Sequence, residues 1–452
     1  PTRYTKQLSA AERAGTQRET LIIKPGRDRG TLRVVLRDDS SVLAERTFAR
    51  GDGGDLPGSI PRGEYIVLSI GACENLRRTL EEQPQLRALG VHLAELDIAA
   101  ALPERWQGYD GVDFVFLLGS QAATTQLIAD DARVDALSLW LRQGGRTIFS
   151  LGAEGELLFA DDAPPRPGLE LLAPGRFERM FELRDSAALE VFAGVSEPLL
   201  VRGSRTRARL QVPLFAVTAE DVAAHGGAAA AELPLIVRQW RGFGEATFVA
   251  FDLNEPMLDI WSGTAPLVTR LLFPNIEHAK TTELHSGRVS HLGYDDLAGQ
   301  LRSALGQFQQ QGVRFLPFGL FAGLLVVYLL LIGPGDYFLL KRFLPRMEYT
   351  WITFGLIVLV TCSGSVWLAR WAKGDAWHRN KVDLVDVDVA SGFARGRTWF
   401  ALFSPESAQF DLQLAAGDDA AASLAWMGLP GAGLGGMEST AAPPLFAEGY
   451  DV

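Results

Sequence analysis

Cysteine is scarce in this sequence, and an excess of positive charge is absent. Only Cys73 and Cys362 occur in 452 residues, so we expect neither a disulfide framework nor a zinc site built from cysteines. The formal net charge of −11 argues against a nucleic-acid-binding surface. Hydrophobic residues make up 47% of the chain, a high share for a soluble protein and a low one for a polytopic transporter. The composition therefore predicts soluble domains joined to a small membrane part.

Two apolar runs without a charge, residues 315–333 and 351–369, are the candidates for that membrane part. Each has 19 residues, and a helix of that length spans about 28 Å, close to the thickness of a bilayer core. Trp351 and Trp367 lie near the ends of the second run, as in an interfacial aromatic belt. Buried core helices are the alternative, but these are usually shorter and amphipathic. The runs predict a transmembrane hairpin.

The segment between the two runs is expected to form the turn of this hairpin. Gly333-Pro334-Gly335 should stop the first helix, because proline lacks an amide donor and glycine permits turn geometry. Asp336 is a candidate cap for the residues that follow, which we expect to lie flat on the membrane with residues 337–340 dipping in. The predicted turn residues, with the basic ones facing headgroups, are Gly333, Pro334, Gly335, Asp336, Lys341, Arg342 and Arg346.

Strand-like and helix-like runs alternate before the membrane part. Residues 64–71, 113–119 and 146–152 are apolar strand candidates, and residues 75–89 and 129–145 have amphipathic helical patterns. This alternation predicts a mainly parallel sheet with helices on both faces. Two further runs, in residues 233–253, flank Arg241-Gly242-Phe243-Gly244 and predict a hairpin.

The flanking segments read as β structure. Residues 31–51 predict two strands joined by a polar turn, and residues 381–405 predict two more. The predicted layout is an N-terminal β segment (1–60), an α/β domain (61–277), a helical stalk (278–314), a transmembrane hairpin (315–333 and 351–369 within 315–369) and a C-terminal β-rich domain (370–452). Because the chain begins with Pro1 and not methionine, we expect further residues beyond both ends.

A family resemblance covers residues 60–410. The stretches YDGVDFVFLLG, LRQGGRTIFSLG, RGFGEATFVAFDLNEP and LLIGPGDYFLLKRFLPRMEYTWITFGLIVL resemble bacterial membrane proteins with a class I glutamine-amidotransferase-like, flavodoxin-like domain. In that family a transmembrane hairpin and a β domain follow. The resemblance implies an α/β domain outside the cytoplasm, two transmembrane helices in the inner membrane and flanking β-rich domains. It also suggests a setting beside MoxR-type ATPases and von Willebrand factor A proteins.

The sequence lacks the catalytic residues of a working amidotransferase at the expected positions. Such an enzyme needs a thiolate on a strand-to-helix elbow and a histidine base. The elbow position after residues 146–152 holds Ala153-Glu154-Gly155, and none of the six histidines has a glutamate two residues later. A rival nucleophile is Cys73, which follows a strand and precedes a helix whose N-terminus could lower its pKa. A packed structural cysteine is the alternative.

Three further patterns suggest binding sites, and each also has a structural or chance explanation. Asp252, Asn254 and Glu255 end a strand at the edge where α/β sheets bind ligands, but loop or helix-cap roles explain them too. Residues 431–436 match the dinucleotide pattern GxGxxG without the strand and helix that it needs. The aspartates of residues 383–388 suggest calcium, but they alternate with valines as on a solvated strand. We therefore expect no cofactor and no metal.

The leading hypothesis from the sequence is a non-enzymatic, membrane-anchored scaffold or subunit of a membrane-associated assembly. The alternatives are a thiol-dependent hydrolase or amidotransferase using Cys73, and a small-ligand sensor. The expected partners are the lipid bilayer and other proteins of a membrane complex, with an oligomer or hetero-complex as the assembled form. The expected location is the bacterial inner membrane, crossed twice, with the large domains on the periplasmic side; charge alone does not decide that side.

Overall fold

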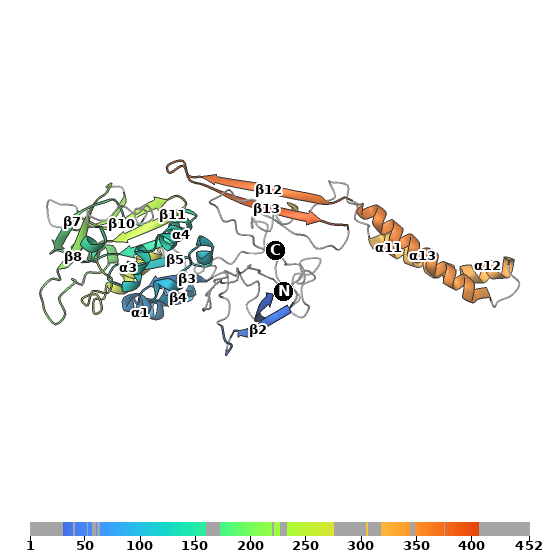
Figure 1. The fold of residues 1–452 in the computed structure, drawn as a ribbon, viewed down its shortest axis with the longest axis horizontal. Helices are drawn as coiled ribbons and strands as arrows, with labels where there is room; N and C mark the ends of the chain where they lie inside the picture. Colours follow the sequence, from blue (N-terminus) through green and yellow to red (C-terminus); the bar gives the residue numbers. More distant parts are fainter. Residues whose placement is uncertain are drawn as a thin grey trace.

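The computed structural model describes residues 30–38, 41–51, 53–56, 60, 64–159, 172–218, 221–226, 233–274, 304–305, 318–343, 349–374 and 376–405. Predictions for most of the stalk, for Arg346 and for residues 431–436 lie outside the described residues. Figure 1 shows an α/β domain at one end, a helical hairpin at the other and the long β12–β13 ribbon between them.

A seven-stranded sheet forms the centre of the α/β domain, with the strand order β4-β3-β5-β6-β11-β10-β9. The strands are β3 (Tyr65–Ile70), β4 (Val91–Leu96), β5 (Phe114–Leu118), β6 (Arg146–Ser150), β9 (Val222–Gly226), β10 (Leu233–Arg241) and β11 (Gly244–Val249). The first four and β11 are parallel to one another, and β10 is antiparallel to both of its neighbours. The prediction of a mainly parallel sheet is confirmed.

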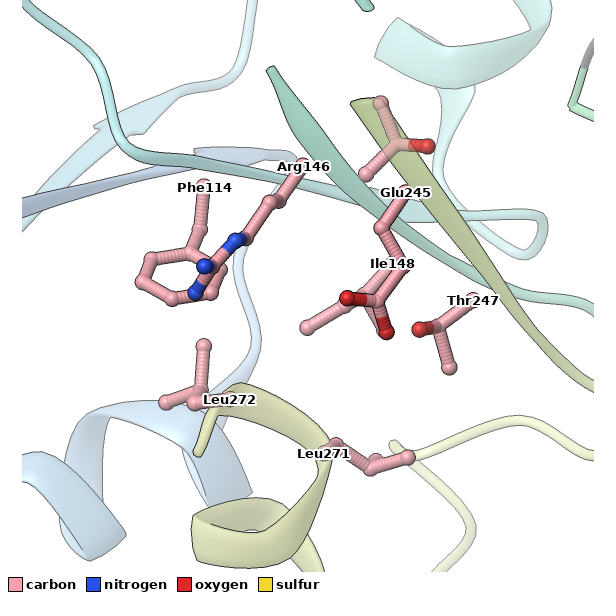
Figure 2. A pocket seen from close by; sticks show the side chains of 8 residues that line it. Phe114, Arg146, Ile148, Glu245, Thr247, Leu271 and Leu272 are labelled. Carbon is pink, nitrogen blue, oxygen red and sulfur yellow. The ribbon is translucent and has the colours of Figure 1, made fainter. Parts of the chain in front are cut away.

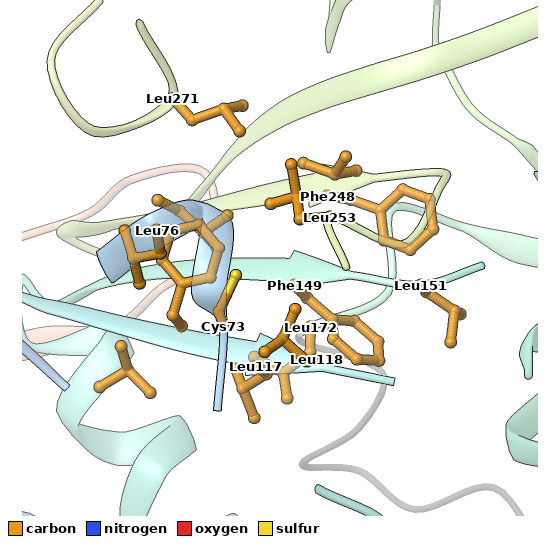
Figure 3. Packing of buried hydrophobic residues seen from close by; sticks show 14 of the residues in the cluster. Cys73, Leu76, Leu117, Leu118, Phe149, Leu151, Leu172, Phe248, Leu253 and Leu271 are labelled. Carbon is orange, nitrogen blue, oxygen red and sulfur yellow. The ribbon is translucent and has the colours of Figure 1, made fainter. Parts of the chain in front are cut away.

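Helices follow the strands as the apolar patterns predict. They are α1 (Glu74–Glu82), α2 (Pro84–Ala88), α3 (Ala122–Ile128), α4 (Asp131–Arg142) and α8 (Thr264–Leu272), with the short helices η1 (Ala99–Ala101) and η2 (Trp106–Tyr109). The N-cap Asp130 accepts a hydrogen bond from the amide of Arg133, and Val134, Leu137 and Leu141 of α4 are buried. Figure 3 shows Leu76 of α1 and Leu271 of α8 on the same side of the sheet. Helices thus cover the sheet and enclose its apolar core.

Residues 172–226 contain structure that the sequence patterns did not predict. The strands β7 (Arg176–Leu183) and β8 (Leu210–Ala216) pair as an antiparallel ribbon, and α5 (Gly155–Phe159) and α7 (Ala187–Ala193) lie nearby in the chain. The ring of Phe215 packs 4.9 Å from Phe248 of β11 and 5.2 Å from Phe159, centroid to centroid. Such aromatic packing joins the ribbon to the sheet. The local spacing of apolar residues does not predict this packing.

Two further antiparallel ribbons lie outside the α/β domain. β1 (Gly30–Asp38) pairs with β2 (Ser41–Arg50), and β12 (His378–Val387) pairs with β13 (Ala394–Phe403) over ten residues of each strand. The first was predicted as two strands joined by a polar turn, and this is confirmed. For the second the two strands were predicted, but their pairing with each other was not.

The described residues of the two apolar runs are helical. The first begins with α11 (Phe318–Leu330), continues through one π-helical turn, η6 (Leu331–Gly335), and ends with α12 (Asp336–Phe343); the second is α13 (Thr350–Lys373). The prediction that Gly333-Pro334-Gly335 stops the first helix is therefore wrong. Proline fixes a φ that suits a helix, and a widened turn accommodates its missing amide donor. The chain bends here, and α12 points away from the axis of α11 (Figure 1).

Candidate functional site

The carboxyl edge of the parallel strands brings together residues that are far apart in the sequence. Cys73 follows β3 and is the N-cap of α1, whereas Asp252 and Asn254 follow β11. Since β5 and β6 separate those two strands, the loop after β11 must cross their ends to reach β3. A hydrogen bond shows that the loop makes this crossing: the side-chain amide of Asn254 donates to the carbonyl oxygen of Ala72 (2.9 Å). The loop thus covers the edge where α/β sheets usually bind ligands.

Two buried polar side chains hold this loop, and the sequence analysis missed both. Ser150 donates from its hydroxyl to the carbonyl oxygen of Phe251 (2.8 Å) and accepts from the amide of Leu253 (2.9 Å). Asn75 donates from its side-chain amide to the carbonyl oxygen of Leu253 (2.8 Å) and to a carboxylate oxygen of Asp259 (3.1 Å). Both side chains are fully buried. In the sequence they are ordinary polar residues at a strand end and in a first helical turn.

The predicted ligand residues also fold the loop. Asp252 is nine-tenths buried, and its Oδ1 accepts a hydrogen bond from the amide of Asn254 (2.8 Å). Burial raises the pKa of Glu255, and the negative charges of Asp252 and Glu154 raise it further. Among the described residues, no three histidine, cysteine or acidic side chains are arranged to hold a metal ion. The hydrogen bonds of Asp252 and Asn254 hold the loop after β11 together and fix it to the end of β3.

A glutamine fills the space beside the first loop of the sheet. The strand order reverses at β3, which has β4 on one side and β5 on the other, and ligands of open α/β sheets bind at such a point. Gly71 follows β3 with a φ of +91°, and a Cβ placed on it would lie 2.4 Å from Cγ of Gln121. Gln121 comes from the loop after β5. Its side chain thus packs directly against Gly71 at the point where the strand order reverses.

Cys73 is enclosed in the apolar core at this edge. Its side chain is fully buried among core residues that include Leu76 and Leu253 (Figure 3). Burial raises the pKa of the Cys73 thiol to about 12. The backbone amides of Leu76 and Asn75 act in the opposite direction but are outweighed. The helix N-terminus therefore fails to activate this thiol.

The described histidine side chains lie away from Cys73. His92 is the second residue of β4 and bonds with Glu64, which directly precedes β3. His378 is the first residue of β12. The charged groups that act on the thiol are the carboxylates of Asp252 and Glu95, and both raise its pKa. Among the described side chains, the thiol thus has carboxylates near it and no histidine that could act as its base.

A small cavity lies at the opposite, amino edge of the strands (Figure 2). Its volume is about 10 Å³, enough for about one water molecule and too small for a metabolite. The residues that line it are Phe114, Arg146, Thr147, Ile148, Glu245, Thr247, Leu271 and Leu272. The Arg146 guanidinium lies 5.4 Å from the centre of the Phe114 ring. The cavity is a packing gap and does not form a substrate site.

The tip of the β12–β13 ribbon contacts the same amino edge. The Arg395 guanidinium lies 4.2 Å from the centre of the Phe243 ring, in the turn between β10 and β11. It also donates to the carbonyl oxygen of Gln143, the C-cap of α4, and its Nε pairs with Asp386 of β12 (2.9 Å). Phe393 adds a ring contact of 6.2 Å with Phe243. We name this set of contacts the ribbon contact; the sequence analysis did not predict it.

The aspartates that suggested calcium have separate partners. Asp383 accepts a hydrogen bond from the hydroxyl of Thr398 (2.7 Å), whereas Asp386 pairs with Arg395. Asp388 accepts a hydrogen bond from Ser391 in the turn of the ribbon, which lowers the pKa of Asp388. Each carboxylate thus stabilises a different part of the ribbon.

The helical hairpin has the features of a membrane-spanning element. The helices Phe318–Arg342 and Thr350–Ala372 are long and apolar enough to cross a bilayer, and their apolar windows are not buried inside the protein. Trp351 and Trp371 on α13 are both exposed. They are 20 residues apart, which corresponds to about 30 Å along a helix and to the thickness of a bilayer core.

Comparisons with known proteins give no family. No family model matches the sequence, and no curated protein matches it. Among solved structures, cytoplasmic protein STM3548 from Salmonella typhimurium is 11% identical, covering 54% of this chain and 95% of its own, with a TM-score of 0.32. A beta-galactosidase from Rahnella sp. R3 is 16% identical, covering 48% of this chain and 32% of its own, with a TM-score of 0.28. Likenesses this low carry no argument about function.

Proposed function

We propose that this chain is a non-enzymatic scaffold or subunit of a membrane-associated assembly, anchored in the bacterial inner membrane by two helices. Its large domains lie on the periplasmic side in this proposal, and its partners are other proteins of the complex. The α/β domain is of the flavodoxin-like, amidotransferase-like kind, and the order β4-β3-β5-β6-β11 supports that assignment because it matches the doubly wound order 2-1-3-4-5.

The observation that carries the proposal is the occupied carboxyl edge of the sheet. A thiol enzyme needs a thiolate that a substrate can reach and a base to form it. Here Cys73 is fully buried with a pKa raised to about 12. The loop after β11 reaches across the strand ends to Ala72, and Gln121 packs against Gly71 beside β3. An enzyme-like fold whose usual site is filled by its own residues supports a binding role over catalysis.

The partner proposal is tested by purifying the tagged full-length chain in mild detergent. We expect reproducible, stoichiometric partners, identified by mass spectrometry and sizing, because a scaffold is defined by what it holds. A matched control is an unrelated two-span protein prepared in the same way. Recovery of a lone monomer, with nothing enriched over the control, would count against the scaffold.

The membrane anchor is tested by placing charge on the lipid-facing surface of α13. We expect the double variant Leu359→Arg, Val360→Arg to lose membrane insertion, because both side chains are about two-thirds exposed and each arginine costs about 3 kcal/mol near the centre of a bilayer. Alkaline carbonate extraction measures the loss: the unmodified chain should stay in the pellet and the variant should be released.

The matched control for the anchor adds the same charge outside the membrane part. Val389→Arg changes a residue that is 91% exposed in the turn of the β12–β13 ribbon, and this variant should stay in the pellet. Retention of all three proteins in the pellet would show that α13 does not set membrane attachment.

A further inference from the structure

The outward face of α12 combines aromatic and basic side chains. Tyr337 and Phe338 are 47% and 65% exposed, and Lys341 and Arg342 are exposed in the last turn of the helix. The Lys341 ammonium lies 5.7 Å from the centre of the Tyr337 ring, one helical turn earlier, so these two side chains share a face. The exposed charges described on this helix are both positive.

The other side of α12 faces the protein. Asp336 and Leu340 are 4% and 1% exposed, and α12 packs against the second helix, α13. The sequence analysis expected Leu340 to dip into the membrane; instead it is packed inside the hairpin. The only described acid of α12, Asp336, lies on this side and not on the outward face.

Helix length places this face at the depth of lipid headgroups. The helical stretch from Phe318 to Gly335, which ends at the bend, has 18 residues and is about 27 Å long, close to the thickness of about 30 Å of the hydrocarbon core. The helix α12, which follows the bend and carries Lys341 and Arg342, therefore begins near the edge of the core. Tyr349 and Trp351 at the start of α13 are also exposed and complete an aromatic belt at this end.

We propose that the outward face of α12 binds the phosphate of anionic phospholipid headgroups, with Lys341 and Arg342 as the cationic groups. The aromatic side chains lie at the boundary with the acyl chains and orient the helix, and the bend at Pro334 turns the face toward the headgroup layer. This inference rests on the proposed membrane anchor and adds a class of lipid to it. A lipid phosphate is favoured over a free phosphate because the basic pair adjoins exposed aromatics at the end of two membrane-type helices.

Native mass spectrometry of the full-length protein in mild detergent tests the lipid preference. Phosphatidylglycerol and phosphatidylcholine are added in turn, and the bound lipids per chain give relative affinities. Each basic residue near an anionic surface contributes about a fivefold preference. We therefore expect Lys341→Gln with Arg342→Gln to reduce the preference for phosphatidylglycerol about 30-fold, and Lys341→Arg to retain it.

A matched control changes a basic residue outside the membrane part. Arg397 is exposed on β13, and Arg397→Gln should leave the preference largely intact. Glycerol phosphate at millimolar concentration should not compete, because a free phosphate lacks the acyl chains that contact the aromatic belt.

Three results would overturn the inference: equal binding of both lipids to the unmodified chain, an unchanged preference in the double variant, or full competition by glycerol phosphate. None of them would remove the proposed anchor, because carbonate extraction measures insertion independently of lipid class. Loss of insertion in that assay is the separate failure of the anchor.

Discussion

A thiol-specific probe added to the folded protein at pH 7.5 should leave Cys73 almost unmodified. The thiolate is the reactive form, and at this pH a thiol with a pKa of about 12 has about a thousandfold less thiolate than a free cysteine. Burial of the side chain adds a barrier to access. We expect alkylation at least a thousandfold slower than that of an exposed thiol, measured by mass spectrometry in a Cys362→Ser chain.

The pH dependence follows from the direction of the shift. Because burial raises the pKa, the thiol stays protonated in the folded protein well above pH 9, where an exposed thiol has already ionised. The alkylation rate should therefore rise about tenfold per pH unit and reach no plateau below pH 11. The stability of the folded chain should fall over the same range as the pH rises. Between about pH 9 and 12 the unfolded chain releases the thiol proton and the folded chain keeps it, so the free energy of unfolding decreases.

The control places a thiol one residue away on the same helix terminus. Glu74→Cys, in a chain that also carries Cys73→Ala and Cys362→Ser, exposes a thiol to solvent because the Glu74 side chain is 69% exposed. It should react at the rate of a free cysteine. If Cys73 in the folded chain reacts as fast as this control and reaches its plateau near pH 7, the proposal of a non-enzymatic scaffold fails and the thiol-enzyme alternative stands.

The α/β core could be predicted from sequence because its signals are local. The strand β5 is apolar over its whole length, β3 is apolar except for Ser69, and β6 has an apolar centre. The helix α4 repeats Val134, Leu137 and Leu141 at helical spacing with an acidic cap before it. These patterns report burial on both faces of a sheet and on one face of a helix. They identify elements without any knowledge of what packs against them.

The state of the site could not be predicted in the same way. Cys73 after a strand and before a helix is compatible with an activated or a packed thiol, and the difference depends on a loop that begins at Ala250, 177 residues later. Ser150 and Asn75 hold that loop by hydrogen bonds to its backbone. Backbone groups are the same in every residue type, so the sequence does not reveal these bonds. At Pro334 the local rule failed, because the wide π-helical turn accommodates a proline that would interrupt an ordinary α-helix.

Arg395→Ala should release the tip of the β12–β13 ribbon from the α/β domain. The change removes a cation–π contact with Phe243 and a hydrogen bond to Gln143, which join Arg395 to the domain, whereas the ion pair with Asp386 lies within the ribbon. A partly buried guanidinium in such contacts contributes about 3 kcal/mol in total, so the released state should gain about a hundredfold in population. The ring contact between Phe393 and Phe243 (6.2 Å) remains in this variant.

Spin labels measure the release as a distance distribution. One label at Val389→Cys, in the exposed turn of the ribbon, and one at Glu74→Cys, on α1, report the separation in a chain that also carries Cys73→Ala and Cys362→Ser. The parent chain should give one narrow distribution, and Arg395→Ala a broad one. Arg397→Ala is the matched control: it lies two residues further along β13, is exposed, and should preserve the narrow distribution.

The outcome decides how the membrane hairpin holds the α/β domain. The ribbon begins at His378, shortly after α13 ends at Lys373, and its ten-residue strands span about 33 Å. Its tip contacts the amino edge of the sheet. Phe243 directly precedes β11, and Gln143 lies shortly before β6. A narrow distribution that Arg395→Ala broadens would mean that the ribbon fixes the domain at a set distance from the membrane, with the opposite edge, the loop after β11, directed away from it. A narrow distribution in both chains would assign that role to other contacts, and a broad one in the parent chain would mean that the domain is tethered without being fixed.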